Sequence, residues 1–463
     1  MTSDSGSGGA VRVRALPATD FDAEAGRAAR ARAPRRAAGE WDPSQRSEPA
    51  LARLRAQEAV RDQELLPLRY ARMASSPWAY LRGAAAVMAA DLAIRPHSGL
   101  TVQMCGDAHI LNFGLWASPE RQLLFDARDF DETLPGPFEW DLKRLATSVY
   151  VLAATESVAG STADEAAQAV IDGYRTAMRR YARSGELDIW YDRITADMPM
   201  EYLTSHFAEE AKRTIDKQSR KRSQEGTARQ LIVVEDGKRR ISEDPLKRRH
   251  FTLGDEEEVS VYEQVFDSYL RSIPPHLERL VGRFTRIDSV RQVVGVGSVG
   301  MRVYLHLMEG DSGRQPVFFQ VKQATASVYE EFLEPSRFDN HGERVCVGQR
   351  LMQTASDIFL GSVRVNEFDY YVRQFRDMKI IPNGHQIAGY LPQFAAVCGA
   401  ALAKSHARSG DPEAISGYIG KGDAFASGIV TYARAYAAQT HTDHADLVAA
   451  IADGEVRAAE QGW

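Results

Sequence analysis

The pattern of hydrophobic and polar residues divides the chain into helical and strand-rich stretches. Residues 140–152 place four apolar side chains on one helical face, which predicts an amphipathic helix: Leu142, Leu145, Val149 and Leu152. Apolar runs broken by loops over 101–116 and 123–130 predict short strands. From residue 290 the pattern alternates and predicts a strand, a glycine turn and two further strands. Residues 391–410 and 424–452 predict C-terminal helices.

Composition places the chain among globular proteins and narrows the class of function. Its 463 residues are 44% hydrophobic and 26% charged, and a chain of this length needs two or three lobes. The net charge of −6 disfavours a nucleic-acid partner, because such binders are usually basic. Mean hydropathy is −0.36, and we expect no membrane span. Three widely spaced cysteines favour a reducing, cytoplasmic location over a disulfide framework.

An aspartate and an asparagine share the loop that follows the first predicted strand. Asp107 and Asn112 lie 112 − 107 = 5 residues apart. Kinase-like phosphoryl transfer needs a carboxylate that orients or deprotonates the acceptor hydroxyl, and an amide oxygen that holds Mg²⁺. An ordinary polar loop carries the same residue types, so the pair is informative only together with its surroundings.

The next predicted strand supplies a carboxylate for a metal ion. Asp126 lies 126 − 112 = 14 residues after Asn112, close to the usual kinase interval, whereas Asp129 opens an Asp-Phe-Asp phrase like the kinase metal motif. A carboxylate at a strand end can bridge Mg²⁺ to nucleotide phosphates. An acidic surface turn is the alternative. We favour Asp129 over Asp126 as the metal ligand.

A glycine-rich turn and a lysine form a second group of candidate residues. Gly295, Gly297 and Gly300 match G-x-G-x-x-G, and the β-prone segment that follows favours a glycine hairpin over a Rossmann turn. Such a hairpin can cover nucleotide phosphates with its N–H groups. Lys322 ends the next strand, and a lysine on a buried strand needs a partner. We expect it to neutralise phosphates and to pair with a glutamate. The candidates are Glu330, Glu331 and Glu343, and we favour Glu343 because it begins the next predicted helix.

Several phrases of the chain resemble the bacterial domain-of-unknown-function 2252 family. They include RYARM, CGDAHILNFG, FDARDFDETLPGPFEWDLKRL, GVGSVG, GQRLMQTASD and LAKSHARSGD, and the resemblance covers about residues 25–455. It implies a distant relation to the protein-kinase-like and aminoglycoside-phosphotransferase fold, with Cys105 where those kinases commonly carry His. Arg69, Arg72 and Arg82 are frequent in the family and either clamp phosphate or form structural ion pairs, and His406 is more typical of a structural histidine.

The order of the two groups is the reverse of that in ordinary kinases. We therefore predict an α+β, kinase-like two-lobe fold with a circular permutation, which changes connectivity while keeping packed contacts. The expected parts are a disordered tail (1–24), a helical large lobe (25–280), a β-rich nucleotide-binding lobe (281–380) and C-terminal helices that complete the large lobe (381–463).

The sequence thus predicts an ATP- and Mg²⁺-dependent phosphotransferase that acts on the hydroxyl of a small molecule. In this interpretation Asp107 orients the acceptor, Asn112 and Asp129 or Asp126 hold Mg²⁺, and the glycines with Lys322 hold the nucleotide. Two alternatives remain: a nucleotide-binding regulator of the pseudokinase type, and a nucleotidyl (AMP) transferase. Neither a nucleic-acid nor a membrane partner is expected.

Overall fold

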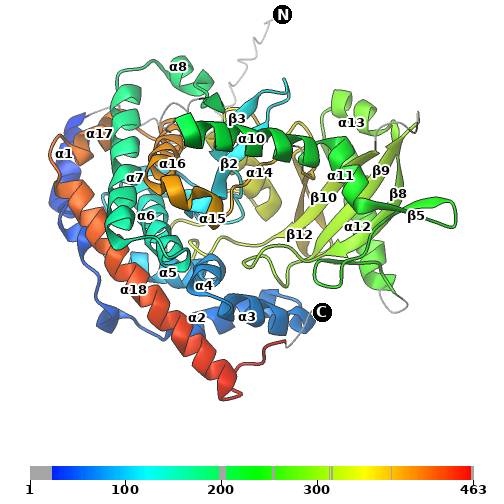
Figure 1. Cartoon of the computed structure of the whole chain (residues 1–463), viewed down its shortest axis with the longest axis horizontal. Coiled ribbons are helices and arrows are strands. Elements are labelled where there is room, and N and C mark those ends of the chain that lie inside the picture. The colour runs from blue at the N-terminus through cyan, green and yellow to red at the C-terminus, as the bar shows by residue number, and fades with distance from the viewer. Residues whose placement is uncertain are drawn as a thin grey trace, which may run out of the picture.

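A group of helices lies beside a β-sheet in this protein, which confirms the expected α+β class (Figure 1). The computed structural model describes residues 23–197, 205–252, 256–311, 313, 316–376 and 378–459. The expected N-terminal tail lies outside the described residues up to residue 22, and helix α1 (Ala23–Arg32) begins immediately after it.

Four long helices form the centre of the helical part: α6 (Phe138–Thr155), α7 (Gly160–Tyr181), α16 (Leu391–Ala407) and α18 (Ala424–Ala452). The apolar face predicted for α6 is buried in the largest hydrophobic core, as expected. Glycines allow α7 and α16 to pack closely. A Cβ on Gly173 would lie 2.1 Å from the Ala396 carbonyl oxygen, and one on Gly399 would lie 2.0 Å from that of Val170. Helix α16, which carries His406, is thus held in tight contact with α7.

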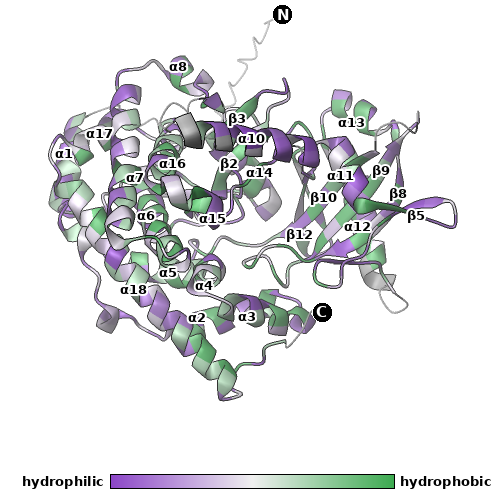
Figure 2. Cartoon of the chain, viewed as in Figure 1, coloured by the Kyte–Doolittle hydropathy of each residue, from purple (hydrophilic) through white to green (hydrophobic). Residues whose placement is uncertain are grey.

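Further helices surround this centre and connect it to the sheet. They are α2 (Ala50–Ala56), α3 (Leu66–Ala74), α4 (Pro77–Gly83), α5 (Ala85–Ala93), α8 (Glu186–Tyr191), α10 (Ser205–Arg222), α11 (Gln224–Leu231), α12 (Glu256–Ser272), α13 (Pro275–Val281), α14 (His341–Met352), α15 (Gly384–Ile387) and α17 (Pro412–Ile419). Helix α10 is largely hydrophilic, whereas α16 is largely hydrophobic (Figure 2). This contrast matches an exposed helix and a core helix.

One helical stretch, Gly384–Ala407, has the length and composition of a membrane span, with a mean hydropathy of 1.2 over its most apolar window. The sequence analysis expected no such stretch. More than half of that window is buried inside the protein, where α16 packs against α7. This is how the core helix of a soluble protein looks, since its apolar surface is already covered by other helices.

Six antiparallel strands form the main sheet in the order β11-β12-β10-β9-β8-β7. Their bounds are β7 (Arg248–Arg249), β8 (Phe284–Gln292), β9 (Val303–Gly310), β10 (Pro316–Ala324), β11 (Gly361–Val365) and β12 (Phe368–Gln374). Lys322 lies on the inner strand β10, opposite Val303 of β9 and Tyr371 of β12. The strands of the sheet thus come from residues 248 to 374. Strand β7 precedes residue 281, at which the β-rich lobe was predicted to begin.

The two faces of the sheet have different environments. On one face α12 packs Phe266 and Tyr269 against Phe319 and its neighbours. Because side chains alternate along a strand, Gln320 and Lys322 lie on the opposite face, together with Phe318. On that face α11 and β6 cover Phe318. Gln320 and Lys322, further along the same strand, are not covered by these elements and border a cavity.

Two predicted turns are confirmed by the strands that they join. The β5–β6 hairpin (Ile232–Glu235 and Lys238–Ile241) turns at Asp236 and Gly237, whose φ angles of 50° and 75° suit a type I′ turn. The glycine turn joins β8 to β9, which pair antiparallel, so a strand and not a Rossmann helix follows it. Gly295 and Gly300 have φ angles of 69° and 90°, which glycine adopts without strain.

Two small two-stranded sheets lie between the helices and the main sheet. Strand β1 (Thr101–Met104) pairs with β4 (Leu134–Pro137), and β2 (Phe113–Ala117) pairs with β3 (Leu123–Ala127). The loop with Asp107 and Asn112 joins β1 to β2, and the segment with Asp129 and Asp131 joins β3 to β4. Both segments therefore face the same side, toward the main sheet.

Candidate functional site

The loop after β1 is fixed by a carboxylate of helix α6. Asp141 is buried and accepts hydrogen bonds from the backbone N–H groups of Cys105 (2.6 Å) and Gly106 (3.0 Å). His406 of α16 lies 3.2 Å from the same carboxylate. Gly106 has a φ of 81°, and a Cβ there would lie 2.3 Å from the Glu132 carbonyl oxygen. The backbone that carries Asp107 is therefore held rigidly, and His406 has a structural role.

Asp107 faces a cavity with one oxygen engaged. Arg144 donates to Asp107 Oδ1 at 2.7 Å and also bonds the Leu81 carbonyl oxygen, and its own side chain is fully buried. Asp107 Oδ2 lies 3.9 Å from His109 Nε2, and the Asp107 side chain is 24% exposed. Buried charge pairing of this kind fixes the carboxylate in one orientation. One oxygen remains available to a molecule in the cavity.

Asn112 ties the loop to the segment after β3. Its amide nitrogen donates to the backbone carbonyl oxygens of Asp107 and Asp129, both at 3.0 Å. Its amide oxygen accepts the Asp129 N–H at 3.0 Å. A carbonyl oxygen has two lone pairs, so Asn112 Oδ1 keeps one after this bond. Asn112 thus holds the two aspartate-bearing segments in register.

The two candidate metal-binding aspartates occupy different environments. Asp126 is buried and forms an ion pair with Lys404 of α16, while Lys404 also bonds Thr354 Oγ1 at 3.0 Å. The Asp129 side chain is 49% exposed, and its Oδ1 atom is buried and accepts no hydrogen bond from the described residues. Burial by itself would raise the pKa of Asp129. The charges of Lys322 and Arg373 outweigh this effect and lower the pKa to about 2. Asp129 is thus the ionised, available carboxylate, and Asp126 serves as an internal counter-ion.

Lys322 pairs with an aspartate that the sequence analysis did not select. Its ammonium bonds Asp131 Oδ2, and Tyr371 donates to Asp131 Oδ1 at 2.7 Å. Lys322 also lies 4.0 Å from Asp129 Oδ1. Burial lowers the pKa of Lys322, but the two aspartates raise it above its ordinary value, so the side chain stays charged. The expectation that Glu343 is its partner is wrong, because Glu343 is exposed in the first turn of α14.

Arginines of the N-terminal helices hold the glycine turn by its carbonyl groups. Arg61 donates to the Gly297 and Val299 oxygens at 2.8 and 2.5 Å. Arg72 donates to the Gly295 oxygen at 2.8 Å. Anchored carbonyl groups leave the turn with a defined shape, although its sequence favours flexibility. The three glycines are therefore brought to the edge of the region that holds Lys322 and Asp129.

Three arginines left open by the sequence analysis now have distinct positions. Arg69 is fully buried and bonds Gln57 at 2.7 Å and the Gly83 oxygen at 3.3 Å, which is a structural role. Arg72 clamps the glycine turn. Arg82 borders the cavities on both sides of this turn, and its buried Nε has no hydrogen-bond partner among the described residues. Of the three, Arg82 is the one available to an anion.

Two cavities meet at the glycine turn and share Arg82, His109, Asp129, Gly295 and Ser298. The first, the Asp107 cavity, has a volume of about 430 Å³ and is also bordered by Asp131, Gly297 and the 323–331 segment. The second, the basic cavity, has a volume of about 290 Å³ and is also bordered by Asn112 and Lys322. The predicted catalytic and phosphate-binding residues thus lie on opposite sides of a shared boundary.

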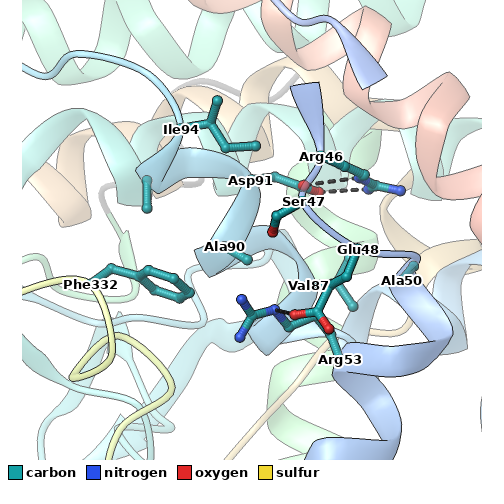
Figure 3. Close-up of a pocket in the computed structure, with 11 residues that line it drawn as sticks. Arg46, Ser47, Glu48, Ala50, Arg53, Val87, Ala90, Asp91, Ile94 and Phe332 are labelled. Atoms are coloured by element: carbon teal, nitrogen blue, oxygen red, sulfur yellow. Dashed lines mark hydrogen bonds and ion pairs between the residues drawn. The ribbon is translucent and has the colours of Figure 1, made fainter. Parts of the chain in front are cut away.

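A separate hollow near α2 and α5 has its charges paired internally. Arg46 forms a bidentate ion pair with Asp91, and Arg53 is bonded to Glu48, while Phe332 lies across the opening (Figure 3). Arg46 also pairs with Asp443 at 2.7 Å. Because these charges satisfy one another, the hollow offers no free group for chemistry, and its pairs fasten the N-terminal helices to α18.

Two important residues were missed by sequence reasoning, although each carried a local signal. Asp131 lies two residues after Asp129, so the Asp-Phe-Asp phrase offers two carboxylates to one strand-end lysine. Arg144 lies three residues after Asp141, which places both side chains on one face of α6. That spacing would have predicted that a single helix holds both the backbone and the side chain of the Asp107 loop.

Comparison with known proteins finds one match. A family model described as an uncharacterized protein conserved in bacteria, DUF2252, matches residues 61–450. No curated protein and no solved structure matches the chain. The matched residues contain the Asp107 loop, the whole main sheet, the lining of the basic cavity and most of the lining of the Asp107 cavity. The chain belongs to the DUF2252 family of bacterial proteins.

Proposed function

We propose that this protein is an ATP- and Mg²⁺-dependent phosphotransferase that acts on the hydroxyl group of a small molecule. The observation that carries the proposal is the boundary between the two cavities. Asp107 borders one cavity, Lys322 and Asn112 border the other, and Asp129 with Gly295 borders both. A phosphoryl group transferred between molecules in the two cavities would cross this boundary.

The basic cavity suits the phosphate donor. Lys322 is charged, and Arg82 carries a buried N–H without a partner beside the glycine turn. Apolar side chains that could contact a base also border this cavity: Leu111, Val294, Phe375 and Ile381. Phosphates together with a base are the parts of a nucleotide, and cations beside a glycine turn are the means by which kinases hold its phosphates.

The metal ion expected with ATP fits the boundary only together with phosphate oxygens. Among the described residues no three His, Cys, Asp or Glu side chains form a metal cluster. Asp129 offers an unpartnered carboxylate oxygen, and Asn112 Oδ1 keeps one lone pair. Mg²⁺ is usually held by one or two protein groups and by substrate phosphates, so this donor set is adequate. Bound there, the ion would neutralise charge on the transferring phosphate.

The Asp107 cavity suits the acceptor. Asp107 is fixed by Arg144 through Oδ1, and its second carboxylate oxygen could accept a hydrogen bond from a hydroxyl group. Orientation of the attacking group is a large part of phosphoryl-transfer catalysis. The α+β architecture, the glycine hairpin and the reversed order of the two groups support a circularly permuted kinase-like fold, which we propose for the chain.

One observation favours a second candidate, a nucleotide-binding regulator that transfers nothing. The buried guanidinium of Arg144 bonds Asp107 and occupies one of the two carboxylate oxygens that a catalytic group could use. A protein of this kind would bind ATP in the basic cavity and change shape without turnover. The candidate makes a different prediction from the phosphotransferase, because no product would form with any acceptor.

The test is ATP consumption by the whole protein with Mg²⁺ and a panel of hydroxyl-bearing metabolites. We expect mass spectrometry to show that the acceptor gains one phosphate group. The Asp107→Ala variant should lose at least about a thousandfold in turnover while its ATP affinity is largely kept. Asp453→Ala, at the exposed residue that follows α18, is the matched control. Gain of AMP would identify nucleotidyl transfer, and ATP binding without any product would favour the regulator.

A further inference from the structure

The basic cavity carries more positive charge than the proposed donor phosphates require. Nine arginine and lysine side chains border this cavity, and Asp129 is the one carboxylate among the described residues that line it. Four of these cations form what we call the distal cluster: Arg128, Arg222, Arg376 and Lys379. They come from three separate parts of the chain, which converge on one place.

The backbone is arranged so that the distal cluster is brought together. Phe375 and Arg376 follow β12, and Ile380 bridges to Leu115 of β2 through two backbone hydrogen bonds of 3.0 and 2.7 Å. The Met378 N–H donates to the Arg222 carbonyl oxygen at 3.1 Å, which ties the end of α10 to Met378. Arg376 and Met378 have φ angles of 57° and 49°, a conformation that non-glycine residues rarely adopt.

The distal cluster lacks acidic partners within the described part of the chain. Arg128 is 9% exposed; it donates one bond, to the Leu111 carbonyl oxygen at 2.8 Å, and its Nε is left without a partner. Arg222 and Lys379 donate no side-chain hydrogen bond to a described residue, and Arg376 only stacks on Phe375. Arg128 is buried, and Arg222, Arg376 and Lys379 are partly buried. Withdrawing cations from water without an acidic partner is costly, and their convergence on one cavity indicates a ligand of opposite charge.

Electrostatic coupling agrees with this geometry. Burial, together with the charges of Arg373 and Arg128, lowers the pKa of Lys379 to about 7. Burial, together with the charges of Arg222 and Arg248, lowers the pKa of Arg376 to about 10. These groups therefore lie within each other's field, and Asp357 and Asp129 oppose that field only in part at Lys379. An anion in the cavity would raise the pKa of Lys379 and so favour its charged form.

We propose that the distal cluster binds phosphate groups of a multiply anionic small molecule, in addition to any phosphates held beside Lys322. The cavity of about 290 Å³ admits a compact polyphosphate group but no macromolecule. The planar guanidinium groups of Arg128 and Arg222 suit bidentate phosphate recognition, and the ammonium of Lys379 acts as a point charge. This binding does not depend on phosphoryl transfer, so it can be tested separately from the proposed enzyme activity.

The test is calorimetric titration of the whole protein with trimetaphosphate and with tripolyphosphate. We expect both to bind, and the double variant Arg222→Gln/Lys379→Gln to bind at least about tenfold more weakly. The matched control is Arg213→Gln/Lys238→Gln, which removes the same charge from exposed positions on α10 and β6 and should change affinity by less than about twofold. Thermal melting of each variant confirms that it is folded.

Two further arms sharpen the result. At pH 8 the wild type should take up a proton on binding trimetaphosphate, whose own charge is constant there, because the anion restores the charge of Lys379; Lys379→Gln should not. Displacement of the probe by ATP would assign the anionic groups to the donor, and simultaneous binding would assign them to a separate phosphorylated ligand. Absence of binding to the wild type, or equal binding to the distal and control variants, would overturn the proposal.

Discussion

The two cavities differ in how their charged groups are satisfied. Around the Asp107 cavity the acids other than Asp129 have partners: Asp107 bonds Arg144, Asp131 bonds Lys322, and Glu331 bonds Arg53. In the basic cavity the distal cluster has no acidic partner among the described residues. The first cavity is therefore preorganised without a ligand, whereas the second carries uncompensated charge. This difference indicates that an anion belongs in the basic cavity and a molecule of low charge in the other.

We expect the largest effect from a substitution of Asp129, because this residue borders both cavities. Asp129→Asn keeps the shape of the side chain and removes a carboxylate whose pKa of about 2 keeps it ionised at neutral pH. We expect turnover to fall at least about a hundredfold and the Mg²⁺ dependence of ATP binding to disappear. Steady-state kinetics and titration across Mg²⁺ concentrations measure this. A variant with normal kinetics and normal Mg²⁺ dependence would contradict the assignment.

Asp126 provides the opposite case, since it borders neither cavity. Asp126→Asn leaves Lys404 buried without its counter-ion, which costs about 3 kcal/mol or more in the free energy of unfolding. Chemical denaturation measures the loss. Anion binding by the folded variant should be unchanged, and a stable Asp126→Asn protein with impaired Mg²⁺ binding would show that the two aspartates have exchanged roles.

Local signals in the sequence predicted several elements well. The glycine turn at 295–300, the hairpin at Asp236-Gly237 and the apolar face of α6 are each encoded within a few residues, and all three are confirmed. The Asp-Phe-Asp phrase likewise pointed to Asp129 as the available carboxylate. These features follow from backbone geometry and side-chain periodicity, which neighbouring residues determine.

Pairs of residues far apart in the chain could not be predicted from local sequence patterns. Lys322 and Asp131 lie 191 residues apart, and no local pattern fixes which acid reaches a lysine. Glu343 was chosen because it begins a helix, but successive helical residues are rotated by about 100°. That rotation turns its neighbour Arg344 inward, onto the Thr133 and Asp131 carbonyl oxygens, and leaves Glu343 in solvent. The distal cluster was missed because its members converge only in the folded chain.

A substitution of Lys379 tests the uncompensated charge of the basic cavity through the pH dependence of stability, with a smaller expected effect. Its pKa is lowered from 10.5 to about 7 in the folded protein, so folding is penalised most where the folded-state lysine is still charged, below pH 7. The penalty then shrinks as pH rises from 7 toward 10.5. Lys379→Gln should therefore raise the melting temperature at pH 6, with a gain that decreases steadily by pH 9. Calorimetry across this range, with Lys238→Gln as control, measures it; a gain independent of pH would contradict the uncompensated charge.

Glu343 should produce the smallest effect of all. It is exposed and distant from the lysine with which it was expected to pair, so Glu343→Gln should change ATP affinity and turnover by less than about twofold. Titration calorimetry and steady-state kinetics measure both. A loss beyond about fivefold would mean that Glu343 reaches Lys322 when ligand is bound. In that case α14 would have to rotate and release Asp131, and the paired state of the Asp107 cavity described above would be only one of two conformations.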